Sequence, residues 1–120
     1  MRTMVQVVAW LLLVAIVVLS LVPPDYRPVT PLPHDVEHVG IFFATGLTFG
    51  LGYESRRTLQ AIALVLFAAL IEVGQLGISG RHARLSDFAV DAGSVCIASG
   101  LAAVVVRAKA KMARNQSPVR

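Results

Sequence analysis

The sequence predicts an all-α integral membrane protein, a bundle of four transmembrane helices. Of its 120 residues, 56% are apolar and only 15% are charged, and the mean hydropathy is +0.71. A soluble domain of this size needs roughly a quarter of its residues charged. Lipid rather than water is therefore expected to cover most of the surface.

Four long apolar runs separate the few charges and give the element boundaries. They span residues 4–22, 36–52, 58–78 and 88–106. Helices of this length rise about 1.5 Å per residue and so approach the thickness of a hydrocarbon core, about 30 Å. We predict one transmembrane domain, residues 1–106, followed by a basic cytoplasmic tail, residues 107–120.

The first two runs each leave an alternative. Arg2 before the first run and the prolines after it are compatible with a signal peptide. Its apolar stretch exceeds the usual 7 to 15 residues, however, and no Ala-x-Ala-like site follows, so an uncleaved helix is predicted. The second run is the shortest and carries Glu37 and His38 at its start, which keeps a re-entrant hairpin open as an alternative.

The distribution of Lys and Arg predicts the orientation. With the N-terminus inside, eight basic residues face the cytoplasm and three face outward. The inner ones are Arg2, Arg56, Arg57, Arg107, Lys109, Lys111, Arg114 and Arg120, and the outer ones are Arg27, Arg81 and Arg84. The excess of positive charge marks the cytoplasmic side, so both termini are predicted to be cytoplasmic.

The net charge of +4 does not indicate a nucleic-acid partner, because no aromatic residue is interleaved with the basic tail. The tail is instead expected to be attracted to anionic lipid headgroups. The single cysteine, Cys96, excludes an internal disulfide and a thiol cluster. Its position in an apolar run predicts a small buried side chain.

Small residues predict close helix packing. Gly46 and Gly50 form a GxxxG motif in the second run, and the fourth run contains Ala92, Gly93, Ser94, Ala98, Ser99 and Gly100. Such residues let helix backbones approach closely in lipid. A compact bundle is therefore expected.

Polar residues gather near the outer ends of three predicted spans. His38 opens the second span, Glu72 and Gln75 share a face near the end of the third, and Asp87 and Asp91 share a face at the start of the fourth. The candidate polar pocket comprises Asp35, His38, Glu72, Gln75, Arg81, Asp87 and Asp91.

Helix capping is a structural explanation for some of these residues, including Asp35 and Asp87. It does not explain Glu72, roughly 10 Å inside its predicted helix end, or Asp91, one turn into the fourth span. Carboxylates at such depth are functional candidates unless they are paired. Pairing of Glu72 with Arg81 or Arg84 would be a structural alternative.

The sequence does not assign a reaction. One histidine among carboxylates without fixed spacing is a poor metal signature, so no metal and no other cofactor is expected. His38 beside carboxylates has the chemistry of a general base, but catalytic residues are not identified. Gly-rich phosphate loops, a serine elbow and HExxH are all absent from the sequence.

The order and spacing of these polar residues resemble the VanZ-like family of small bacterial membrane proteins. The matching segments, within residues 20–106, are PHDVEH at 33–38, IEVGQ at 71–75, GR at 80–81, SD at 86–87 and then Asp91. The chain departs from the family pattern in three places: Val36 replaces a Lys, Asp91 replaces an Asn, and Ser94 replaces a Gly.

The resemblance implies that the site residues are Asp35, His38, Glu72, Gln75, Arg81 and Asp87. It also implies a location in the bacterial cytoplasmic membrane and a role in the cell envelope or in antibiotic resistance. The family is named after a protein associated with resistance to teicoplanin, and it supplies no reaction.

Three hypotheses follow. In the favoured one, an outer polar pocket binds a lipid-linked or cell-wall intermediate. In the second, the chain is a structural or assembly subunit of a membrane complex. In the third, it is a small intramembrane enzyme in which His38 and Glu72 share acid and base roles on a lipid-borne substrate. The expected partners are the lipid bilayer and an envelope intermediate, not nucleic acid.

Overall fold

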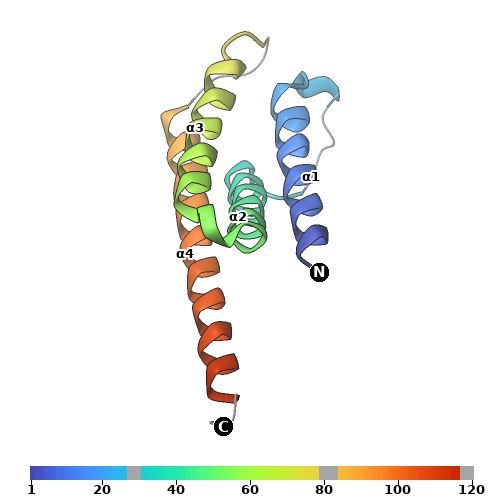
Figure 1. Ribbon diagram of the computed structural model, residues 1–120. Helices are drawn as coiled ribbons and strands as arrows, with labels where there is room; N and C mark the ends of the chain where they lie inside the picture. Colours follow the sequence, from blue (N-terminus) through green and yellow to red (C-terminus); the bar gives the residue numbers. More distant parts are fainter. Residues whose placement is uncertain (27–30, 79–83, 117–120) are drawn as a thin grey trace.

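The chain folds into a bundle of α-helices in the computed structural model, which describes residues 1–26, 31–78 and 84–116. The α-helices are α1 (Arg2–Leu21), α2 (His34–Gly52), α3 (Arg57–Gln75) and α4 (Leu85–Gln116). Short 3-10 turns, η1 (Pro24–Tyr26) and η2 (Glu54–Arg56), follow α1 and α2 (Figure 1). The predicted all-α fold class is confirmed over these residues.

Among the described segments, three are long and apolar enough to cross a membrane: Arg2–Leu21, Glu54–Gln75 and Leu85–Gln116. Their length and composition are consistent with the predicted transmembrane helices. Helix α2 is as long as α3, at 19 residues, but Asp35, Glu37 and His38 in its first turns make it less apolar. The length and composition of α2 therefore do not show that it is a fourth transmembrane helix.

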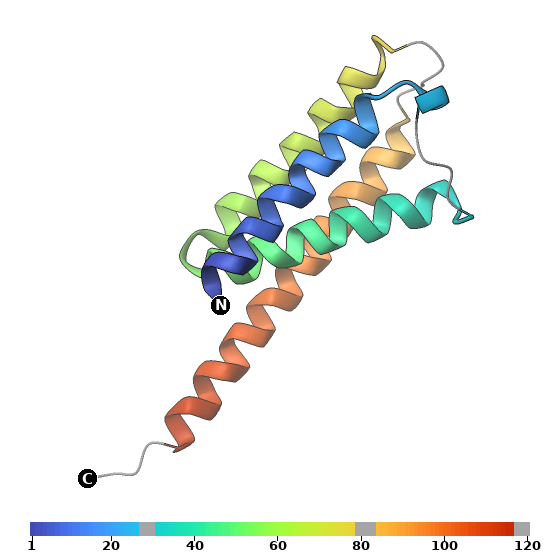
Figure 2. The ribbon, with the colours of Figure 1, turned by 90° about the vertical axis from the view of Figure 1, so that its right-hand side faces the viewer.

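The helices alternate in direction between two ends of the bundle. The N-terminus and η2 lie at one end, and the C-terminal end of α3 and the N-terminal ends of α2 and α4 lie toward the other (Figure 2). Helix α2 crosses the other three obliquely, whereas α1, α3 and α4 run roughly side by side. Helix α4 continues well beyond the others, which gives the molecule extents of 67 × 23 × 22 Å.

The closest helix packing is between α2 and α4, at the predicted GxxxG motif. A Cβ atom placed on Gly50 would lie 2.7 Å from Cβ of Ala102. One placed on Gly46 would lie 3.1 Å from Cα and the carbonyl oxygen of Val95 and from Cβ of Ala98. Only glycine fits at this separation, so the predicted close packing is confirmed. We call this contact the α2–α4 seam.

The interior is small and the exterior is largely apolar. The core cluster consists of Ala9, Ile16, Phe42, Phe49, Leu64, Ala68, Ile71 and Val95. Outside it, Leu11 and Val14 of α1 are 63% and 54% exposed, and Leu70 of α3 is 69% exposed. An apolar surface of this kind suits a hydrocarbon environment.

Two boundaries and one burial prediction differ from expectation. Helix α3 ends at Gln75 rather than at 78, because Leu76 and Gly77 turn through bonds to the carbonyls of Val73 and Gly74. Helix α4 continues past 106 to Gln116, so residues 107–116 of the predicted tail are helical. The remaining residues, 117–120, lie outside the described part of the chain.

The prediction that Cys96 is buried was wrong, since its side chain is exposed.

Candidate functional site

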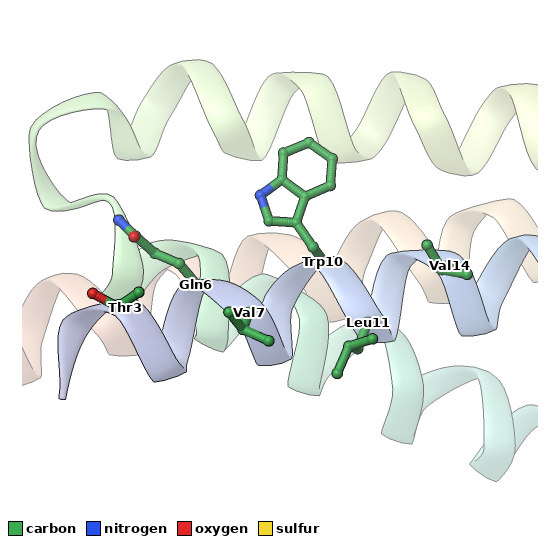
Figure 3. Close-up of a pocket in the computed structure, with 6 residues that line it drawn as sticks. All are labelled: Thr3, Gln6, Val7, Trp10, Leu11 and Val14. Atoms are coloured by element: carbon green, nitrogen blue, oxygen red, sulfur yellow. The ribbon is translucent and has the colours of Figure 1, made fainter.

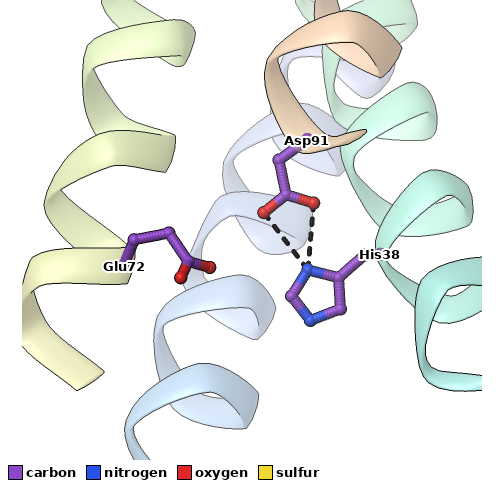
Figure 4. Close-up of side chains that lie close together, drawn as sticks. All are labelled: His38, Glu72 and Asp91. Atoms are coloured by element: carbon purple, nitrogen blue, oxygen red, sulfur yellow. Dashed lines mark hydrogen bonds and ion pairs between the residues drawn. The ribbon is translucent and has the colours of Figure 1, made fainter. Parts of the chain in front are cut away.

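Three buried polar side chains meet toward the end of the bundle where α2 and α4 begin. They are His38 of α2, Glu72 of α3 and Asp91 of α4, which are 7%, 6% and 0% exposed. Figure 4 shows the Glu72 carboxylate turned toward the other two side chains. One nitrogen or oxygen atom from each lies within 4.8 Å of the others. We call these three residues the buried cluster.

The shortest contact in the buried cluster joins His38 to Asp91. The Asp91 carboxylate accepts from Nδ1 of His38 at 2.9 Å through Oδ1 and at 3.1 Å through Oδ2. The ring of Phe42, one turn further along α2, stacks on the imidazole at a centroid distance of 6.2 Å. Both neighbours restrict rotation of the imidazole, so its orientation is well defined.

The α2–α4 seam explains why these two residues meet. The two helices start toward the same end of the bundle and run in the same general direction while crossing obliquely, with Gly46 beside Ala98 and Gly50 beside Ala102. His38 and Asp91 pair in the same register, about two turns nearer the start of both helices. Small residues therefore fix the register on which the polar contact depends.

Within the described residues, Glu72 is held by a main-chain N–H and not by a cationic side chain. Its Oε2 accepts from the backbone N–H of Arg84 at 3.1 Å, and the Arg84 side chain is exposed. The other oxygen, Oε1, is buried and has no hydrogen-bond partner in the part of the chain that the structure describes. Glu72 thus contacts Arg84 as expected, but through the backbone N–H of Arg84 and not through its guanidinium group. Arg81 lies outside the described residues.

The remaining predicted pocket residues fall into two groups. Gln75 and Asp87 are buried, at 4% and 8% exposed, and Asp87 accepts from Oγ of Ser86 at 3.1 Å. Asp87 also lies near enough to act electrostatically on His38 and Glu72. Asp35 is exposed in the first turn of α2, so the structure does not bring it into the buried cluster.

The balance of charge determines what the buried cluster can bind. Among the described residues, the carboxylates of Glu72 and Asp91 lie beside the imidazole of His38, Asp87 acts electrostatically on the same group, and the Arg84 side chain is exposed. Negative charge at low dielectric attracts cations and hydrogen-bond donors strongly and repels anions. The site therefore suits an amine, a hydroxyl or amide donor, or a metal cation.

Sequence reasoning missed a second polar junction at the opposite end. Nε1 of Trp10 donates to the hydroxyl of Tyr53 at 2.9 Å, and Nε2 of Gln6 donates to the carbonyl of Gly52 at 2.9 Å. Gln6 and Trp10 also border a surface hollow of about 290 Å³, together with Thr3, Val7, Leu11 and Val14 (Figure 3). This hollow is almost wholly apolar and faces outward from α1, so it offers no reactive group.

Comparisons of the chain with family models, with curated proteins and with solved structures found no match. The resemblance to the VanZ-like family stays a prediction that depends on the residues quoted above.

Proposed function

We propose that this chain is a VanZ-like protein of the bacterial cytoplasmic membrane whose buried cluster binds a lipid-linked or cell-wall component. In this proposal, four helices span the bilayer, both termini are cytoplasmic and the buried cluster lies near the outer face. The main support is the convergence of His38, Glu72 and Asp91 from three different helices. The resemblance of the polar residues to the family pattern adds the envelope role.

The pattern of exposure along α2 supports a fourth span. His38 and Thr45 are 7% and 0% exposed, whereas Val36 and Val39 are 49% and 44% exposed. His38 and Thr45 thus face the bundle, and the two valines face outward. Thr45 also satisfies its hydroxyl by donating to the carbonyl of Ile41 at 2.7 Å. Such a helix can face lipid although its mean hydropathy is lowered by its polar side.

Binding explains the buried cluster better than a purely structural role does. The α2–α4 seam already fixes helix register through Gly46 and Gly50, so no polar pair is needed for that purpose. A structural polar network is normally satisfied at every atom. Oε1 of Glu72 lacks a hydrogen-bond partner among the described residues. An acceptor in this state is expected where a ligand supplies the hydrogen bond.

The charge of the site narrows the chemical class of the ligand group. Oε1 of Glu72 lacks a hydrogen-bond donor among the described residues. An unaccompanied phosphate would be repelled by this oxygen, whereas an amine, a hydroxyl or an amide would donate to it. We therefore propose that the polar donor groups of an envelope intermediate, such as the amines and amides of a cell-wall peptide, enter the buried cluster.

A second candidate function follows from the His38–Asp91 contact. A carboxylate that orients an imidazole is the arrangement of a general base, so a small intramembrane enzyme acting on a lipid-borne substrate is the alternative. The described structure shows no activated nucleophile beside the pair: Cys96 is exposed, Ser86 donates to Asp87, and the buried Ser94 donates to the carbonyl of Val90. Turnover abolished by His38→Ala in a folded protein would favour this alternative.

The test of the binding proposal is Glu72→Gln, returned to a deletion strain and measured for folded yield and for teicoplanin susceptibility. We expect folded yield close to that of the parent and loss of complementation, because the substitution removes charge but keeps volume. Glu54→Gln is the matched control, since Glu54 is exposed at the other end of α3. It should behave as the parent in both measurements.

Two results would contradict binding. Joint loss of fold and complementation in Glu72→Gln would support the structural or assembly role, in which the carboxylate holds the bundle together. Retention of both would remove Glu72 from the functional site.

A further inference from the structure

The buried cluster presents the donor set of a metal centre. His38 supplies a ring nitrogen, and Glu72 and Asp91 supply carboxylate oxygens, with the three donor atoms within 4.8 Å of one another. We infer that these three residues coordinate a divalent transition-metal ion. The inference shares with the proposed function the premise that the buried cluster is a binding site, and it names the ion that occupies it.

A second observation points to a cation at this place. Oε1 of Glu72 is buried and lacks a hydrogen-bond partner within the described chain, and the carboxylate is turned toward His38 and Asp91 (Figure 4). A buried carboxylate oxygen without a donor is strongly destabilising. A divalent ion between the three side chains would satisfy this oxygen.

The separations are close to those that a metal requires. Zinc ligands lie about 2.0–2.2 Å from the ion, which places donor atoms of a tetrahedral set about 3.3–3.5 Å apart. In the buried cluster, Nδ1 of His38 is 2.9 Å from Oδ1 of Asp91, and the three donor atoms lie within 4.8 Å of one another. A metal bound at Nδ1 would replace the proton that this nitrogen donates to Asp91, because a metal-bound imidazole nitrogen carries no proton. Movement of the Glu72 carboxylate by about 1.5 Å closes the difference, and rotation of its long side chain allows this.

The donor types select the metal. Imidazole nitrogen suits zinc, iron and nickel, whereas carboxylate oxygen suits manganese, magnesium and calcium. A mixed set of one nitrogen and two oxygens without a thiolate favours Zn²⁺ or Mn²⁺ over calcium, which prefers six to eight oxygens. Three protein ligands also leave at least one coordination position for water or for a ligand. Through that position, the site would accept an oxygen of the envelope component, including a phosphate oxygen.

Metal uptake by the purified full-length chain tests the inference. The protein carries Cys96→Ser, which removes the exposed thiol, and no affinity tag, and it is treated with a chelator and then titrated with Zn²⁺ or Mn²⁺. Bound metal is counted by mass spectrometry after desalting. We expect one ion per chain, and an affinity at least about tenfold weaker in Glu72→Gln and in Asp91→Asn.

Matched controls separate the buried cluster from other acidic groups. Glu54→Gln and Asp25→Asn make the same chemical changes at exposed positions and should bind metal as the parent does. If the cluster variants fail to fold, Co²⁺ bound to the parent gives a second measurement. Its visible absorption should show a four- or five-coordinate nitrogen and oxygen site and should disappear when Zn²⁺ is added.

Two outcomes would overturn the inference: less than one ion per chain in the parent, or equal affinity in Glu72→Gln and the parent. These outcomes are distinct from failure of the proposed function, because the titration contains no envelope component. If the parent binds no metal but Glu72→Gln loses complementation, the metal inference is wrong and the proposal of an envelope ligand stands. If the parent binds metal but Glu72→Gln still complements the deletion, the metal inference stands and the proposed envelope role is wrong.

Discussion

The α2–α4 seam leads to a quantitative prediction for Gly50→Ala. The new Cβ would lie 2.7 Å from Cβ of Ala102, whereas carbon atoms in good contact are about 3.5–4.0 Å apart. The two helices must therefore separate by about 1 Å at this point. Overpacking of this kind costs about 1–3 kcal/mol, and the better helix propensity of alanine returns about 0.5–1 kcal/mol. The midpoints of these two ranges give an expected net loss of about 1 kcal/mol in the free energy of unfolding.

Removal of the opposing methyl group should rescue the variant. Ala102 is fully buried, and Ala102→Gly in the Gly50→Ala background recreates the space on the other helix. We expect the double variant to recover about 1 kcal/mol, because the two substitutions act on one contact. Gly100→Ala is the matched control on α4, since a Cβ there would meet nothing within 4 Å among the described residues.

Unfolding in mixed micelles of increasing SDS content measures these differences. Trp10 is the single tryptophan of the chain, and its ring packs edge-on against Phe49 at 5.4 Å. Its fluorescence therefore reports on the segment next to Gly50. A parent-like midpoint for Gly50→Ala, or a double variant no more stable than Gly50→Ala, would refute the proposed packing.

Three further predictions use other parts of the molecule. Trp10→Phe should lower the free energy of unfolding by about 0.5–1.5 kcal/mol, because the 2.9 Å hydrogen bond to the Tyr53 hydroxyl is lost. Circular dichroism in the SDS titration measures this loss. If the losses of Trp10→Phe and Tyr53→Phe simply add in the double variant, the two residues do not share a hydrogen bond. Reporters fused after Arg57 and inserted at Asp25 should report the cytoplasm and the outer side, respectively, and the reverse result would invert the topology. A membrane-impermeant maleimide should label the exposed Cys96 only after SDS dissolves the bilayer, and labelling in intact vesicles would show that this face of α4 contacts water.

The helices could be predicted because long apolar runs leave few other structures in a membrane. Hydropathy locates the part of a helix that suits lipid, and it does not locate the end of the helix. The apolar run stops at Val106, but Ala, Lys and Arg favour helix, so α4 continues to Gln116. Likewise, a run of apolar residues does not reveal which face is inward, which is why Cys96 was assigned to the interior.

The candidate site could be predicted only in part. The depth of Glu72 and Asp91 in their spans marked both as unusual, and both are buried. Their contact with His38 depends on the register of α2 against α4. The spacing of residues within one helix does not predict that register. Ligands supplied by three separate helices likewise leave no metal motif in the sequence. Asp35 was included because the family resemblance implies it, but it lies exposed in the first turn of α2.

The distribution of the buried cluster along the chain has a consequence for assembly. His38 belongs to the first helical hairpin, α1 and α2, whereas Glu72 and Asp91 belong to the second, α3 and α4. A cut in the η2 turn would divide the protein into two fragments, neither of which holds all three side chains. Any ligand bound in the buried cluster would contact both hairpins and stabilise their association. At a concentration one hundred times its dissociation constant, that ligand would strengthen their association by about 2.7 kcal/mol.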